Sequence, residues 1–134
     1  MKRFHVLSFL LALASSHVMA MSTDAVALEM SSLSVGHQLA ADDPAVARTR
    51  AMLEQVSKLS GDDATAIFAA CRRYIGHLHD AAQIKATPLE LLAALAVAAS
   101  GTPINDTLQA YVAARKAAPE KTHAGAMALL AKQK

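Results

Sequence analysis

Residues 87–101 read TPLELLAALAVAASG, and this stretch decides the fold of the chain. Thr87 and Glu90 have the spacing of a helix capping box, and Pro88 takes the first helical position, where its missing N–H is not needed. The residues that follow are apolar almost all the way round a helix, as far as Ser100-Gly101. A helix without a polar face has to be covered on every side. We therefore expect it to be the buried centre of a helical bundle.

The same kinds of start and stop signals divide the rest of the chain into helices. Aspartate-proline and threonine-proline pairs stand where helices would begin, and glycine or proline stands where they would end. No stretch keeps the alternation of a strand, and no Asn-Gly or Asp-Gly hairpin turn occurs. The sequence predicts an all-α bundle of five to six short helices. They are expected over residues 24–40, 44–60, 64–83, 88–100, 103–118 and 122–131.

The first twenty residues have the layout of a secretory signal peptide. Met1-Lys2-Arg3 is a short basic start, Phe4–Ala14 is an apolar run, and Val18-Met19-Ala20 offers small residues for cleavage. We expect cleavage after Ala20, a single helical domain over residues 21–134, and a periplasmic or secreted protein.

Charge and hydropathy limit the partners of that domain. The net charge of +2 comes from Lys2 and Arg3 in the leader, so residues 21–134 are near neutral. A nucleic-acid-binding role, which needs a basic surface, is not expected. The apolar run from Leu91 to Ala99 is far shorter than the roughly 20 residues that span a bilayer. No membrane span is predicted after the leader.

The only cysteine of the chain falls on the apolar side of the third predicted helix. A disulfide framework is therefore excluded, and a thiol buried among apolar side chains is expected to be inert. The alternative is a disulfide between two chains. Tyr74 and Tyr111 are also assigned to the core, with their hydroxyls at its edge. The apolar stripe of this helix consists of Ile67, Phe68, Cys71, Tyr74, Ile75, Leu78 and Ala82.

The polar side of the same helix is the candidate partner-binding face. It carries Arg73, His77 and Asp80, with Arg72 at its border. Such a face is either simply solvated or a docking surface for an acidic partner. His77 and His79 lie about 200° apart on a helix and cannot bind one metal ion together. The sequence predicts no metal, cofactor or catalytic residue.

Two further features have structural explanations. The aspartate pairs Asp42-Asp43 and Asp62-Asp63 precede helices, where negative charge is favourable, so they are interpreted as caps rather than as catalytic carboxylates. Gly76 lies inside a helix, where glycine is unfavourable. It is either tolerated there or allows another backbone to approach closely.

Residues 71–81, CRRYIGHLHDA, resemble a segment of a known family. The pattern Cys-x-Gly-Tyr-Ile-x-Gly-x-x-Asp-Ala is typical of the exported amidase-immunity proteins of type VI secretion, the Rap/Tai group. The resemblance implies a small, all-helical periplasmic protein that binds and blocks a peptidoglycan amidase. Arg73 and His77 replace the two glycines of the pattern, and the family's other cysteines are absent. The resemblance implies binding and no catalytic residue. The matching residues are Cys71, Tyr74, Ile75, Asp80 and Ala81.

Three functions from different classes remain open. The first is a non-enzymatic exported domain that binds a partner protein, with inhibition of a cell-wall amidase as its most specific form. The second is a self-associating or chaperone-like periplasmic protein. The third is a secreted enzyme similar to an all-α chorismate mutase, which would need cationic side chains that converge on a pocket. Its candidate cations are Arg48, Arg72, Arg73, Arg115 and Lys116.

Overall fold

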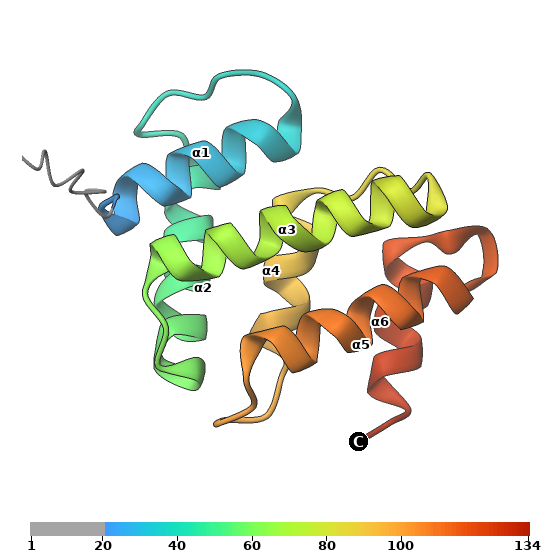
Figure 1. Cartoon of the computed structure of the whole chain (residues 1–134). Helices are drawn as coiled ribbons and strands as arrows, with labels where there is room; N and C mark the ends of the chain where they lie inside the picture. Colours follow the sequence, from blue (N-terminus) through green and yellow to red (C-terminus); the bar gives the residue numbers. More distant parts are fainter. Residues whose placement is uncertain (1–20) are drawn as a thin grey trace, which may run out of the picture.

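The computed structural model describes residues 21–134, and these form an all-helical domain (Figure 1). The predicted signal peptide and its cleavage site lie outside the described residues. No strand occurs within residues 21–134, so the predicted fold class is confirmed. The elements are α1 (Thr23–Val35), α2 (Pro44–Ser60), α3 (Ala64–Ala82), α4 (Pro88–Ala96), α5 (Ile104–Ala117), the 3-10 helix η1 (Pro119–Lys121) and α6 (His123–Ala131).

Side-chain caps account for most of the helix starts. Asp43 and Asp63 accept hydrogen bonds from the first turns of α2 and α3, as predicted for the two aspartate pairs. Thr87 and Glu90 form the predicted capping box of α4, in which each side chain binds the other residue's backbone N–H. α5 differs, because Pro103 precedes it and no side chain caps it. Thr102 is therefore not the cap that the sequence suggested.

α4 is the centre of the bundle. It packs against α1, α2, α3 and α5, and Figure 1 shows it behind α3 with the other helices around it. Leu91 and Leu92 are completely buried, and Ala94 and Leu95 are nearly so. These alanines and leucines let neighbouring helices approach closely from several sides. The central position predicted for this stretch is confirmed for α4, whereas Val97, just past its end, is 46% exposed rather than covered.

In Figure 1, α1, α3 and α5 lie as a layer in front of this centre, and α2 and α6 lie behind them with α4. In Figure 1, α3 crosses the molecule between α1 and α5, and α6 lies at the far end from α1. α1 packs mainly on α2, whereas the main contacts of α6 are with α5 and η1. The two ends of the domain are therefore held by different neighbours.

Two helices end earlier than the sequence predicted. α1 stops at Val35 because Gly36 takes the left-handed conformation that closes a helix, so the predicted extension to residue 40 is wrong. α4 stops at Ala96 rather than near Ser100, and the chain then turns so that the Gly101 N–H binds the Leu59 carbonyl at the end of α2. Among the described helices, none has the length and hydropathy needed to cross a membrane.

Candidate functional site

The predicted partner-binding face lies on α3, and its four residues are exposed. They do not form one cluster. Arg73 donates a hydrogen bond of 2.8 Å to the Asn105 side chain of α5, and the His77 ring packs on Tyr74, whose hydroxyl lies 3.5 Å from the Asn105 carbonyl. Arg72 instead lies over the Phe68 ring. The face is divided between a side toward α5 and a border that belongs to Arg72.

Asp80 has only a local partner. Its carboxylate lies 3.2 Å from the ring of His79, and both side chains are largely exposed. An exposed pair of this kind contributes little to stability. Asp80 is therefore available to solvent at the end of α3, and it takes no part in the contacts of Arg73 and His77.

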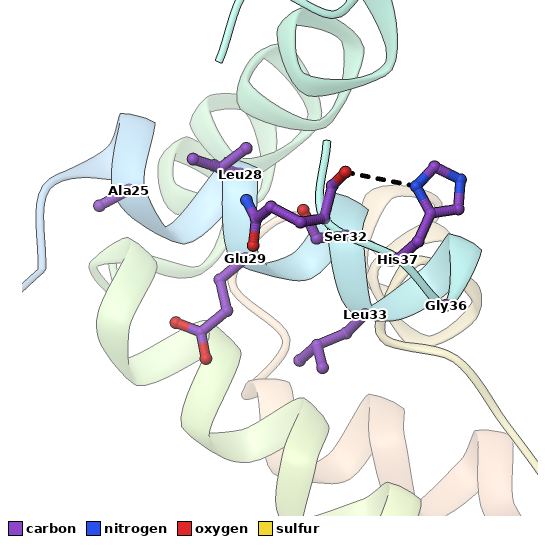
Figure 2. A pocket seen from close by; sticks show the side chains of 8 residues that line it. Ala25, Leu28, Glu29, Ser32, Leu33, Gly36 and His37 are labelled. Atoms are coloured by element: carbon purple, nitrogen blue, oxygen red, sulfur yellow. Dashed lines mark hydrogen bonds between the residues drawn. The ribbon is translucent and has the colours of Figure 1, made fainter. Parts of the chain in front are cut away.

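A groove of about 610 Å³ runs along the outer side of α1, and sequence analysis did not single it out. Apolar and polar side chains alternate along it. In Figure 2, Glu29 and Leu33 project from the same side of α1, one helical turn apart, and Leu28 projects from another side. His37 closes one end, with its ring nitrogen 3.3 Å from the Gln38 carbonyl oxygen. Leu33 is 52% exposed, the most exposed of the large apolar side chains described.

A second hollow, of about 300 Å³, shares Leu33 with the first. It lies between α1, α3 and the start of α4, and Arg72 is its charged residue. We call the surface around these two hollows the Leu33 patch. Apolar and polar side chains both line it. The apolar ones include Leu28, Leu33, Ile75 and Pro88, and the polar ones include Glu29, His37 and Arg72.

A buried polar cluster connects the helices at the other end of the bundle, and sequence analysis did not predict it. The Arg115 side chain is only 8% exposed. Its Nη1 donates hydrogen bonds of 2.8 Å to Glu90 Oε2 and 2.8 Å to the Tyr111 hydroxyl, and its Nε donates one of 2.6 Å to the Lys121 carbonyl. The Tyr111 hydroxyl lies 2.7 Å from Nδ1 of His123. One guanidinium thus connects α4, α5 and η1, and Tyr111 extends the connection to α6.

The cluster changes the acidity of its members. Burial raises the pKa of Tyr111, although the hydrogen bond and charge of Arg115 oppose the change and Glu90 adds to it. Burial lowers the pKa of His123, while Glu90 raises it and Arg115 lowers it further. The neutral imidazole suits its position, because Nδ1 can then accept the Tyr111 hydroxyl proton while that oxygen accepts from Arg115.

The backbone beside this cluster is unusual. Glu120 and Lys121 have φ values of 55° and 53°, in the left-handed region that non-glycine residues avoid. The hydrogen bond from Arg115 to the Lys121 carbonyl holds the second of them. Gly125, in the first turn of α6, is also constrained: a Cβ there would lie 3.0 Å from the Cβ of Ala118. At Gly76, by contrast, a Cβ would meet nothing within 4 Å, so close backbone approach does not explain that glycine.

Cys71 is a core residue, as predicted. It is completely buried and unpaired, and burial raises its pKa to about 12. A thiol with such a pKa is almost entirely protonated near neutral pH and is a poor nucleophile. A disulfide between two chains would require its helix to leave the core.

The cations considered for an enzyme do not converge. Of these five cations, only Arg115 is buried, and its Nε and Nη1 already donate to protein oxygens. Arg48, Arg72, Arg73 and Lys116 are exposed, on α2, α3 and α5. Within residues 21–134, no group of three or more His, Cys, Asp or Glu side chains is placed to hold a metal ion.

Comparisons of the chain with protein-family models, with curated proteins and with solved structures find no match. The function is therefore argued from the geometry of the Leu33 patch and from the resemblance of residues 71–81.

Proposed function

We propose that the chain is an exported, non-enzymatic helical domain that binds another protein through the Leu33 patch. The observation that carries this proposal is that two hollows meet at one exposed leucine. Exposed apolar side chains with polar ones beside them are common in protein interfaces. Small-molecule sites are more enclosed and converge polar groups on a ligand.

The chemistry of the patch suits a partner that inserts an apolar side chain. Leu33 stands between the groove along α1 and the hollow toward α3, so an inserted side chain would contact it from either side. Glu29 lines the first hollow and Arg72 the second, and neither forms an ion pair with another described residue. Both charges therefore remain free to orient a partner. Arg72 is the one member of the predicted α3 face that lines the patch.

The partner that we propose is a peptidoglycan amidase. This identity rests on the resemblance of residues 71–81 to amidase-immunity proteins, and on the signal-peptide layout of residues 1–20, which would place the domain where peptidoglycan is found. Ile75, one of the residues that match the family pattern, also lines the second hollow of the Leu33 patch. The proposed action is to occlude the amidase by binding, without chemistry.

The test is to measure inhibition and binding with a panel of purified peptidoglycan amidases. Replacement of an interface anchor commonly weakens binding by about 2 kcal/mol or more, roughly 30-fold, so Leu33→Arg should lose inhibition to at least that extent. Val97→Arg is the matched control, because Val97 is 46% exposed but lies at the end of α4, outside the patch.

Three outcomes would contradict the proposal. The first is that no amidase in the panel is bound, and the second is that Leu33→Arg inhibits as well as the original chain. The third is a sedimentation experiment in which the original chain forms dimers that dissociate on dilution and Leu33→Arg forms none. This result would support the self-associating alternative. Export is tested separately, by the mass of the protein recovered from the cell envelope, which should correspond to a chain beginning at Met21.

A further inference from the structure

The connection between α5 and α6 has the features of a latch. α6 is held mainly by α5 and η1, and its first residue, His123, carries the only imidazole in the buried polar cluster. The preceding residues Glu120 and Lys121 are held in an unfavourable backbone conformation. Such strain favours a rearrangement of η1 whenever the contacts that maintain it are lost. We infer that α6 is an acid-releasable arm, freed from α5 when His123 binds a second proton.

The hydrogen-bond directions provide the mechanism. With a neutral His123, a continuous chain runs from Glu90 through the Arg115 guanidinium to the Tyr111 hydroxyl and on to Nδ1 of His123. Every donor in it has an acceptor. A proton on Nδ1 would turn this acceptor into a donor, so the Tyr111 proton would lose its acceptor. Protonation therefore reverses the direction of the Tyr111–His123 hydrogen bond and leaves the Tyr111 hydroxyl proton without its acceptor, which weakens the link between α5 and α6 at its centre.

The two charges nearest His123 act in opposite directions, because Glu90 raises the pKa of His123 and Arg115 lowers it. The groups that face it are Glu90 of α4 and Arg115 with Tyr111 of α5, and the side chains of Glu120 and Lys121 in η1 point to solvent. Glu90 lies 3.7 Å from Nδ1 but already pairs with Arg115 at 2.8 Å. An imidazolium would therefore leave two positive charges sharing one carboxylate in a partly buried site.

The direction of the pH dependence follows from linkage. The net pKa of His123 is lower with α6 in place than in a free chain, because burial outweighs Glu90. The released state therefore binds a proton more readily than the docked state. The stability of the docked arm is complete above the ordinary histidine pKa and decreases as the pH falls from there through the lower pKa of the docked state. Release would uncover the α5 surface around Tyr111 and Ala114, both now buried. This inference does not depend on the Leu33 patch.

The test is amide hydrogen exchange on the full-length protein as isolated, between about pH 7.5 and about pH 5.5, which brackets the ordinary histidine pKa. Rates are corrected for the intrinsic effect of pH. Residues 123–131 should lose protection at the lower pH while α1, α2 and α3 keep theirs. His123→Asn, which cannot titrate, should keep α6 protected at both pH values. His77→Asn, an exposed histidine on α3, should respond like the original chain.

A second variant guards against misfolding of the first. Tyr111→Phe keeps the ring in the core but removes the hydroxyl, whose hydrogen bond to His123 depends on the protonation state of the imidazole. It should make α6 protection lower at the higher pH and nearly insensitive to acid. The inference is overturned if α6 is equally protected at both pH values in the original chain. It is also overturned if all helices lose protection together, or if His123→Asn keeps the full acid response.

Discussion

Replacement of Arg115 by methionine is the most direct test of the buried polar cluster. Methionine roughly keeps the apolar stem of the side chain but removes the guanidinium. Three hydrogen bonds are lost, to Glu90, to the Tyr111 hydroxyl and to the Lys121 carbonyl. Removal of one partner from a buried ion pair destabilises a protein by about 3–5 kcal/mol, because the other charge stays buried alone.

The lower end of that range applies here. The Glu90 side chain is 22% exposed and still accepts a hydrogen bond of 3.0 Å from the Thr87 backbone, so water and the cap partly compensate its carboxylate. We expect Arg115→Met to lower the free energy of unfolding by about 3 kcal/mol. For a domain of this size that corresponds to a decrease in Tm of roughly 10–20 °C.

Urea and thermal unfolding followed by circular dichroism at neutral pH would measure this loss. Lys116→Met is the matched control, because Lys116 is the exposed neighbour of Arg115 and its replacement should change stability by less than about 0.5 kcal/mol. Arg115→Lys keeps the charge but has no Nε to bind the Lys121 carbonyl, so it should fall between the two. A loss below about 1 kcal/mol for Arg115→Met would refute the reasoning that this cluster holds the end of the bundle.

Three further predictions concern single positions. Cys71→Ser should lower the free energy of unfolding by about 1–2 kcal/mol because it buries a hydroxyl, with no loss of partner binding. The native thiol should react with a disulfide reagent only after unfolding. Loss of binding at unchanged stability would contradict the assignment of Cys71 as an inert core thiol. Gly76→Ala should raise the free energy of unfolding by about 0.5–1 kcal/mol through helix propensity. Gly125→Ala should lower it, because the added Cβ would crowd Ala118. Thermal melts in which Gly125→Ala is the more stable variant would contradict the spacing described around these two glycines. Thr87→Ala should cost about 1 kcal/mol by removing the cap of α4, and an unchanged melt would show that the capping box is dispensable.

Local signals in the sequence were enough to predict the fold class and most helix starts. Asp43, Asp63 and Thr87 cap helices in the structure because a cap depends on residues within one turn. The early end of α4 could not be predicted in the same way. Its apolar composition continues past Ala96, and the chain turns there to reach α2, where the Gly101 N–H binds the Leu59 carbonyl.

The buried polar cluster escaped prediction because its members lie on separate helices. Glu90 and Arg115 are far apart in the chain, and an arginine is ordinarily assigned to the surface. A signal was nevertheless present: Arg115 follows Tyr111 by four residues and Leu108 by seven, which places it on the apolar side of α5. A charged residue in an apolar stripe indicates a partner from another helix, although spacing cannot say which.

The Leu33 patch shows a different limit. The sequence pattern pointed to Arg72, Arg73, His77 and Asp80 as one face of α3, and only Arg72 borders the patch. Helical spacing shows which residues share one helix surface, but not which neighbouring helix lies beside each of them. The exposure of Leu33 could not be predicted from the sequence, because it depends on where α3 and α4 leave space beside α1.

The central position of α4 also bears on how the domain assembles. Nine residues are too few for a helix to persist in water without neighbours, since isolated helices shorter than about 12 residues are marginal. α4 can therefore become helical only as the four helices that enclose it come together. The backbone amides of α4 should exchange only when the whole domain unfolds. Truncated chains that lack any one of the four helices around α4 should therefore fail to form a partial bundle. The short central helix α4 thus makes folding an all-or-none event.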